Sequence, residues 1–468
     1  MPLPVISVAQ MRDWEKESWD AGKSEAEVIR RVGKMVAEHA LRMTRGGDSI
    51  LILAGKGHNG DDARHAVEHL ASRRVELLEI KNPETDFAGL DAKISLRPAL
   101  VVDGLFGIGI NRPLNAGWIK LIQRINSERL KILAVDVPSG LDAESGQPNG
   151  AAIQAAVTLT VGAPKRGLLL ESAWPFVGRL EVAADVGLSD CLFQSEINWT
   201  LSGDFTDFPA ARPVAGHKGT FGHLAIIAGS IGFHGAGVLA SRGAQRARPG
   251  LITLFPHDSA YASCAAQLQA VMAQSWSPRV DLPGAFSALL AGPGLAAPIL
   301  PDELKRAIGT LWQNAAIPMI VDASALAWLP QGAARENAIR VITPHPGEAA
   351  RLLETTSARV QSNRPESLRE LSRRFGNCWV VLKGHQTLVG RSEGEIFVNS
   401  SGNPYLAQGG SGDVLSGFLA GFLAQPALQA DALKTIRFAV WKHGAAADRL
   451  EIEKPNWVVE DLVAALGI

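Results

Sequence analysis

The sequence predicts an α/β protein of two domains, each built around a parallel sheet that helices cover. Three observations predict this fold class. The chain has 468 residues, which is too long for one ordinary hydrophobic core. Short apolar runs rich in β-branched residues alternate with longer segments of helical periodicity in both halves. Residues 188–216 interrupt this alternation with prolines, glycines and aspartates, as a linker does. We therefore expect one domain over residues 1–200 and a second over residues 201–468.

The first half contains four candidate buried strands, each followed by glycine, proline or aspartate. They cover residues 50–54, 100–103, 132–137 and 157–161. Helical patterns over residues 14–42 and 63–73 lie around them. Continuous apolar strands are typical of parallel sheets buried on both faces. Ligands of such sheets bind beyond the carboxyl ends of the strands, so polar motifs at those ends are candidate sites.

The second half repeats the same alternation with a new set of candidate strands. They cover residues 224–228, 251–255, 288–291, 319–322, 341–343 and 379–383. The longest apolar run, residues 414–423, contains two glycines and is too short to span a membrane. We expect this run to form a core helix.

Composition limits the classes of function. Hydrophobic residues make up 46% of the chain and charged residues 20%, and the formal net charge is −1, which gives no reason to expect binding to nucleic acid or an anionic membrane. Cys191, Cys264 and Cys378 are far apart and form no metal-ligand spacing, so we expect free thiols. The first twenty residues lack a basic-then-apolar signal pattern. We expect a cytoplasmic protein.

The most informative motif is GGSGD at residues 409–413, which follows GNP at 402–404 and opens the apolar helix. A glycine-rich turn at a helix start collects backbone N–H groups that point at an anion. A carboxylate there repels phosphate, but it is useful if it takes a proton from a hydroxyl that attacks a phosphoryl group. The motif therefore indicates phosphoryl transfer to an alcohol, with Asp413 as general base. The simpler alternative is an acidic residue that stabilises the helix start.

Further motifs of the second half follow candidate strands or precede one. HKGTFG at 217–222 precedes a strand that ends in AGS, and GPGL at 292–295 follows another strand. In TPHPGE, Glu348 is either a first-turn acid or a ligand of hydrated Mg²⁺. In LKGHQT, Lys383 is either a phosphate partner or a lysine that extends from the sheet edge into water.

The order of these motifs resembles the ADP-dependent NAD(P)H-hydrate dehydratases, a branch of the ribokinase-like αβα fold, over roughly residues 210–468. The resemblance implies repair of hydrated NADH and NADPH. ADP phosphorylates the hydroxyl that water added to the nicotinamide ring of the S hydrate, and phosphate then leaves, which restores the double bond and releases AMP. We also expect Mg²⁺ as a cofactor, because Glu348 is a possible ligand for it near phosphates.

The resemblance also assigns residues. Those that contact hydrated NAD(P)H are Ala236, Gly294, His345 and Asp413. Those that hold ADP are Lys383, Gly384, His385, Gln386, Thr387 and Gly412. Asp413 is the base, and the amides of Gly410 to Gly412 stabilise the transferring charge. Departures from the family pattern concern nucleotide affinity. They are the bulky pair at 385–386, DASAL at 322–326 in place of DADAL, and HGAAAD at 443–448 without a second glycine.

Three motifs of the first half follow candidate strands. They are GKGHNGDD at 55–62, DG with GIG at 103–109, and DVPSGLD at 136–142. Together they resemble the NAD(P)H-hydrate epimerase domain, with a Rossmann-like three-layer αβα fold, over about residues 3–188. That family inverts the carbon that bears the added hydroxyl and binds K⁺. The implied K⁺ ligands are Asn59, Asp103 and Ser139. The implied substrate residues are His58, Asn59, Gly60, Asp61, Asp62, Gly107, Ile108, Gly109, Ile110, Asn111, Arg112, Pro113 and Asp136, the last also catalytic.

One departure in this half bears on activity. The family reads NNGGDG where this chain reads HNGDDA, so Asp61 adds a negative charge near a diphosphate. Two unit charges ~4 Å apart repel by roughly 1 kcal/mol in water and about 4 kcal/mol near a protein surface. We therefore expect reduced or altered epimerisation with K⁺ ligation retained. In the alternative, Asp61 points away or is neutralised by Arg64.

Two rival functions stay open at this stage. The first is a kinase of vitamin precursors, because GGSGD and TPHPGE also serve ribokinase-like kinases. The second is a nucleotide-binding scaffold whose first domain has lost catalysis, which Asp413, His345 and Lys383 argue against for the second half. The fusion argues against the kinase, because a vitamin kinase has no need of the motifs in the first half. For either function we expect small-molecule substrates and a homo-oligomer.

Overall fold

The computed structural model describes residues 2–110, 112–298 and 300–467, and the chain divides into two compact units, Leu3–Ser195 and Glu196–Ile468. The interpretation of residues 188–216 as a linker is wrong in part. Strand β8 (Ile197–Trp199) lies inside this range and pairs in parallel with β17 (Ile396–Val398) of the second unit. A three-residue strand flanked by polar residues gives no periodic signal, so it reads as linker from sequence alone.

The first unit contains a six-stranded sheet in the order β3-β2-β4-β5-β6-β7, in which all neighbouring strands run parallel. The strands are β2 (Ser49–Ala54), β3 (Arg74–Glu79), β4 (Leu100–Gly104), β5 (Ile132–Val135), β6 (Val157–Val161) and β7 (Arg179–Ala183), and the two-residue strand β1 (Leu3–Pro4) precedes them. The four expected strands are present. Strands β3 and β7 were missed because edge strands carry charged side chains that break the apolar pattern.

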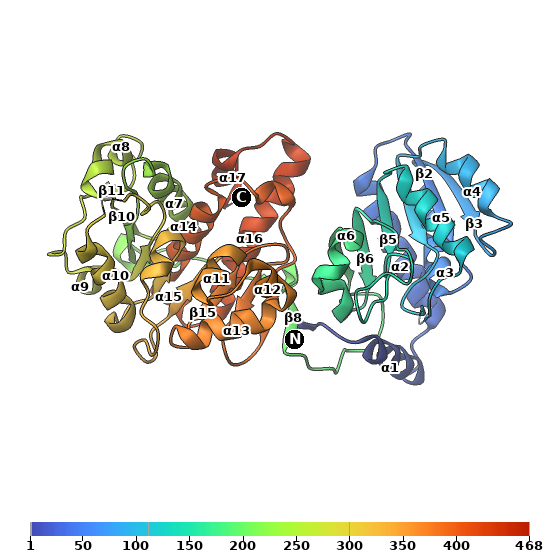
Figure 1. Ribbon diagram of the computed structural model, residues 1–468, viewed down its shortest axis with the longest axis horizontal. Helices are drawn as coiled ribbons and strands as arrows, with labels where there is room; N and C mark the ends of the chain where they lie inside the picture. The colour runs from blue at the N-terminus through green and yellow to red at the C-terminus, as the bar shows by residue number, and fades with distance from the viewer. Residues whose placement is uncertain (1, 111, 299, 468) are drawn as a thin grey trace. The chain divides into compact units, whose positions relative to one another are not determined.

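Helices cover both faces of this sheet. They are α1 (Val8–Asp20), α2 (Glu25–Met43), α3 (His58–Ala66), α4 (Phe87–Ile94), α5 (Ala116–Ser127) and α6 (Trp174–Val177). Alternate residues of β2 point to opposite sides, so that Ile52 belongs to an apolar cluster with Val36 of α2, whereas Leu51 belongs to another with Ile122 of α5. The first unit is therefore a three-layer αβα domain (Figure 1).

Two helix predictions for the first unit need correction. The expected helix over residues 14–42 is two helices, and Ser24 starts the second by accepting a hydrogen bond from the Glu27 amide at 3.3 Å. The expected helix over residues 63–73 begins earlier, at His58, and ends at Ala66 before a short 3₁₀ turn. The GKGHNGDD motif therefore contributes the first turn of α3, which places it directly after β2.

The sheet of the second unit runs in the order β8-β17-β16-β15-β14-β13-β12-β9-β10-β11. Its other strands are β9 (His223–Ile227), β10 (Leu251–Phe255), β11 (Met272–Ala273), β12 (Ala288–Ala291), β13 (Met319–Val321), β14 (Arg340–Ile342), β15 (Trp379–Leu382) and β16 (Leu388–Gly390). All six expected strands are present and run parallel, whereas β16 runs antiparallel to both of its neighbours.

The helices of the second unit form two groups that lie in different parts of the unit in Figure 1. The first group packs around the predicted core helix and contains α7 (His234–Ala247), α14 (Ser411–Leu423), α16 (Ala432–Glu453) and α17 (Val459–Ala465). The second contains α10 (Asp302–Asn314), α11 (Pro346–Leu352), α12 (Ser357–Ser362) and α13 (Arg364–Arg374). Short helices α8 (Tyr261–Ala265), α9 (Leu282–Ala285) and α15 (Pro426–Gln429) complete the unit.

Close packing of α14 on α7 requires Gly417, because a Cβ there would lie 1.9 Å from the Ala240 carbonyl oxygen.

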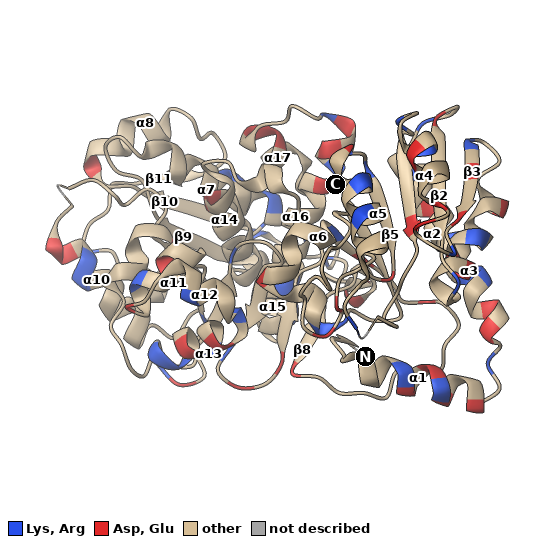
Figure 2. Ribbon diagram, turned by 45° about the vertical axis from the view of Figure 1, so that its right-hand side comes forward, with Lys and Arg blue, Asp and Glu red and all other residues tan. Residues whose placement is uncertain are grey.

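Residues of both charge signs occur on helices such as α1, α10 and α13 (Figure 2). Within the described part of the chain, no helix combines the length and the hydropathy that crossing a membrane requires. The three cysteines are free thiols, as expected.

Candidate active sites

Asp413 lies in the first turn of α14, whose N-terminus is formed by the glycine-rich motif. Gly410 has a φ of 97°, a conformation that L side chains rarely adopt, and the helix begins at the next residue. Burial, together with the charges of Asp322 and Glu348, raises the pKa of Asp413 to about 7 against the opposing charge of Lys383. A carboxylate with a pKa near neutrality is suited to accept a proton at physiological pH.

Lys383 follows β15 and reaches the start of α14. Its Nζ lies 2.8 Å from Oδ1 of Asp322 and 4.0 Å from Oε2 of Glu348. A Cβ built on Gly412 would lie 3.4 Å from the same Nζ. The side chain is only 19% exposed, so the alternative of a lysine that extends into water does not hold. The Lys383 ammonium therefore lies near the N-terminus of α14, and both groups attract an anion.

The TPHPGE segment forms the start of α11. The Glu348 carboxylate accepts a hydrogen bond from the His345 amide at 2.9 Å, and His345 Nδ1 accepts one from the Glu348 amide at 3.3 Å. This reciprocal pair is a capping box, so the interpretation of Glu348 as a first-turn acid fits the geometry. Burial lowers the pKa of His345, which favours the neutral imidazole.

Ala236 and Gly294 come together although they are far apart in sequence. Gly294 has a φ of 65°, and a Cβ there would lie 2.9 Å from Cβ of Ala236 and 2.3 Å from the carbonyl oxygen of Phe233. They lie on segments that follow β9 and β12, which are neighbours in the sheet. The two segments can therefore approach this closely only because position 294 is glycine.

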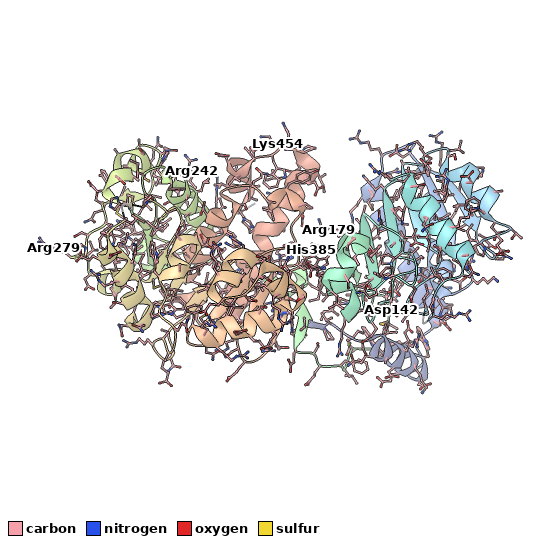
Figure 3. All side chains as sticks on the ribbon, viewed as in Figure 1. Asp142, Arg179, Arg242, Arg279, His385 and Lys454 are labelled. Atoms are coloured by element: carbon pink, nitrogen blue, oxygen red, sulfur yellow. The ribbon has the colours of Figure 1, made fainter. Side chains whose placement is uncertain are left out.

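Residues 383–387 form the connection between β15 and β16, where Figure 3 labels His385. Gly384 and Gln386 both have positive φ, 127° and 52°, and Thr387 Oγ1 donates to the Gly384 carbonyl at 3.1 Å. The side-chain nitrogen of Gln386 is buried and has no hydrogen-bond partner in the described structure. Sequence reasoning missed Arg364, whose Nη2 donates to the Leu382 carbonyl at 3.0 Å and so supports this loop from α13.

In the first unit, Asp103 and Ser139 form a buried pair at the carboxyl end of β4. Asp103 accepts hydrogen bonds from the Ser139 hydroxyl at 2.6 Å and from the Ser139 amide at 2.8 Å, and burial raises the pKa of Asp103 to about 6. The side-chain oxygen and nitrogen of Asn59 are buried without partners among the described residues. Gly107, on the loop after β4, would place a Cβ 3.4 Å from the Asn59 side chain.

Asp136 follows β5 and is paired with a lysine that sequence reasoning missed. Lys165 Nζ donates to Asp136 Oδ1 at 2.6 Å, and its side chain is fully buried. Asp136 has a φ of 62°, an uncommon conformation for a residue with a side chain. Gly107 would place a Cβ 3.2 Å from its other carboxylate oxygen, so one oxygen faces the loop that also reaches Asn59. A single lysine after a strand, in APKRG, was the signal available in the sequence.

His58 and Asp61, the two residues of the GKGHNGDD motif that depart from the family pattern, have different surroundings. Asp61 pairs with Nη1 of Arg64 at 2.6 Å, and Arg64 Nη2 also donates to the Gly55 carbonyl at 2.5 Å. This geometry favours the alternative in which Arg64 neutralises Asp61. The His58 side chain is 75% exposed and lies 3.0 Å from a carboxylate oxygen of Glu25.

The remaining predicted residues of the first unit separate into buried and exposed sets. Asp62 is buried, and burial raises its pKa well above the ordinary range. Gly60 packs so closely that a Cβ would lie 2.2 Å from the Gly55 carbonyl oxygen. Ile108 and Ile110 are half-buried, whereas the exposed residues of this loop are Gly109, Arg112 and Pro113. Asn111 lies outside the described residues.

The fold and these sites define a two-domain α/β enzyme, with polar clusters at the carboxyl ends of two parallel sheets. The second unit resembles a ribokinase-like superfamily protein from Enterococcus faecalis in structure, at 24% identity and a TM-score of 0.52, over 60% of this chain and 97% of that one. This likeness agrees with the expected ribokinase-like fold.

Comparison with known families gives the identity. The NAD(P)H-hydrate dehydratase family model matches residues 224–464, and the model of the YjeF-related protein N-terminus matches residues 75–167. A bifunctional NAD(P)H-hydrate repair enzyme from Gloeobacter violaceus is 31% identical over 99% of this chain and 97% of its own length. One from Coxiella burnetii is 30% identical over 94% and 93%. The chain belongs to the family of bifunctional NAD(P)H-hydrate repair enzymes, which combine an epimerase and a dehydratase.

Proposed function

We propose that the second domain catalyses the ADP-dependent dehydration of S-hydrated NADH and NADPH, with Asp413 as the general base. The observation that carries this proposal is the position of Asp413 in the first turn of α14, beside the Lys383 ammonium and with a pKa near 7. Asp413 accepts the proton of the hydroxyl on the hydrated ring as that oxygen attacks the terminal phosphorus of ADP. The bond from phosphorus to the bridging oxygen breaks, and AMP leaves.

Elimination then completes the reaction. The phosphorylated hydrate loses phosphate as its carbon–oxygen bond breaks, and the ring nitrogen lone pair and loss of a ring proton restore the double bond of NAD(P)H. The amides at the start of α14 and the Lys383 ammonium stabilise the negative charge on the transferring group. The small residues Ala236 and Gly294 leave space for the nicotinamide ring, and His345 borders it.

The residues around Glu348 bear on how Mg²⁺ takes part. One Glu348 oxygen is engaged at 2.9 Å by the His345 amide, and the other lies 3.5 Å from His345 Nε2. The described residues contain no cluster of three His, Cys, Asp or Glu side chains suited to a metal. We propose that Mg²⁺ enters with the nucleotide, whose phosphates supply ligands for it, and neutralises phosphate charge there.

For the first domain we propose epimerisation of the R and S hydrates at the Asp136 site, with K⁺ held nearby. Asn59 fits a K⁺ ligand because its amide oxygen is buried and unpartnered, and oxygen donors suit a hard alkali cation. Asp103 and Ser139 supply further oxygens next to the same loop. K⁺ would fix the loop after β4, and Asp136 with Lys165 would move the proton.

The experiment is recovery of the NAD(P)H absorbance band from a mixture of both hydrate epimers, with Mg²⁺, K⁺ and ADP, and with ATP for comparison. Full recovery supports both activities. Recovery that stops when one epimer is consumed supports the dehydratase and contradicts the proposed epimerase. No recovery with either nucleotide contradicts the whole proposal and favours the kinase of vitamin precursors, which is then tested with alcohols and ATP.

A further inference from the structure

Asp322 is a buried carboxylate to which the proposed reaction assigns no role. It follows β13, is 1% exposed, and binds the Lys383 ammonium at 2.8 Å. The next residue, Ala323, has a φ of 52°, an uncommon conformation for a residue with a side chain. Strained backbone of this kind is found where the surroundings fix a side chain for function.

The backbone of Asp322 is held from a neighbouring strand. Its amide donates to the Ala291 carbonyl at 3.0 Å, and a Cβ on Gly292 would lie 1.8 Å from the Asp322 carbonyl oxygen. Gly292 therefore has to be glycine for Asp322 to occupy this place. The carboxylate is thus fixed to the sheet, whereas its partner Lys383 has a long flexible side chain.

The Lys383 backbone is fixed as well, which leaves the side chain as the variable part. Its amide donates to the Pro344 carbonyl at 2.9 Å, and Arg364 holds the preceding carbonyl. Burial lowers the pKa of Lys383, but the charges of Asp322 and Glu348 more than offset this, so the pKa lies above its ordinary value. The ammonium is therefore charged, and the contact with Asp322 selects the conformation in which it lies beside Gly412.

We propose that Asp322 is a positioning residue that holds the Lys383 ammonium at the start of α14, in readiness for the transferring phosphoryl group. This inference rests on the proposed function of the same site. Asp322 does not touch the reacting atoms. It acts through Lys383, so that little reorganisation of this charge is needed when the transition state forms.

The test is a double-mutant cycle on the full-length protein with Asp322→Asn and Lys383→Met. Asp322→Asn keeps size and an acceptor oxygen but removes the charge. We expect it to lower kcat for ADP-dependent dehydration by up to about 100-fold, with little change in KM for the hydrate. In the Lys383→Met background the same substitution should lower kcat several-fold less than in the parent chain, because only the direct effect of the Asp322 charge on Asp413 then remains.

Asp461→Asn is the matched control. Asp461 pairs with a lysine as well, Lys454, at 2.7 Å, and its carboxylate accepts a hydrogen bond from the Val458 amide at the start of α17, a helix that contains none of the predicted site residues (Figure 3 labels Lys454). We expect it to change kcat less than about twofold. Equal losses of kcat from Asp322→Asn in both backgrounds, or a loss no larger than that of the control, would overturn the inference.

A second measurement does not depend on turnover. Competitive acetylation with acetic anhydride, read by mass spectrometry, reports the reactivity of individual lysines. We expect Lys383 to react several-fold faster in Asp322→Asn than in the parent chain, because losing the carboxylate lowers the pKa of Lys383 and raises the fraction of neutral amine, which is the reactive form, whereas other lysines keep their rates. Unchanged reactivity of Lys383 would overturn the inference, whereas absence of turnover in the parent chain would contradict the proposed function alone.

Discussion

Asp413→Asn should separate stability from activity. The substitution keeps the size of the side chain and removes its ability to take a proton. We expect NAD(P)H-hydrate dehydration to fall by about 10²–10⁴-fold, which is the typical contribution of general base catalysis. At the same time we expect the second domain to become more stable at neutral and alkaline pH, because a charged carboxylate that is poorly solvated is removed.

The magnitude follows from the pKa. A carboxyl raised from 3.8 to about 7 corresponds to about 4 kcal/mol between its two protonation states. The folded-state pKa lies above the unfolded value, so the folded state keeps its proton longer. Stability is therefore highest below the unfolded pKa and falls as the pH rises towards 7. Partial exposure to solvent reduces the effect, so we expect a gain of about 2 kcal/mol for the variant at pH 8.

The assay is urea denaturation of the full chain without nucleotide, followed by circular dichroism at about pH 5 and pH 8. The stability difference between Asp413→Asn and the parent chain should be larger at the higher pH. A difference that is the same at both values, or a variant that is less stable at pH 8, would refute the electrostatic reasoning. Retained turnover would refute the role of Asp413 as base.

Three other predictions concern the same two sites. Arg64→Gln should expose the charge of Asp61 and raise KM for the hydrates in the epimerase reaction about tenfold or more, without changing dehydratase kcat; an unchanged KM would mean that Asp61 points away from substrate. Replacing Na⁺ by K⁺ should raise the thermal midpoint of the parent chain, and Asn59→Ala should abolish that response, as differential scanning calorimetry would show. Gly294→Ala should raise KM for the hydrate at least tenfold, because its Cβ would lie 2.3 Å from the Phe233 carbonyl oxygen; wild-type kinetics would show that the loop gives way.

Local sequence patterns predicted the strands that build both sheets, because continuous apolar β-branched runs have few alternatives to a buried parallel strand. The same patterns failed at edges. Strand β3 has the sequence RVELLE, whose exposed charged residues interrupt the apolar pattern. Strand β8 is too short to show an alternating pattern. The break between α1 and α2 was missed because residues 21–24 are only a short interruption between two segments of helical periodicity.

The candidate sites were predicted as separate motifs, and several of their residues, such as Lys383 and Gly412 or Asn59 and Gly107, lie close together in the structure. What the motifs do not contain is the partner of each charge. Lys165 is signalled only as a lysine after a strand, although its Nζ lies 2.6 Å from Asp136 Oδ1 in the first site. Asp322 appeared only as part of an atypical DASAL segment, yet it holds Lys383. Such pairs join residues that are far apart along the chain, so no spacing rule finds them.

The sequence by itself determined the two-domain α/β architecture, the phosphoryl-transfer chemistry suggested by GGSGD, and the resemblance to an epimerase fused to a dehydratase. These depend on local patterns, in which residue type and spacing fix the backbone and the chemistry. Only the tertiary structure decided the electrostatic state of the sites. It paired Asp61 with Arg64, buried Asp413 beside Asp322 and Lys383, and left the Asn59 amide without a partner. The physical reason is that pKa and charge balance depend on burial and through-space distance, which the linear order of residues does not encode.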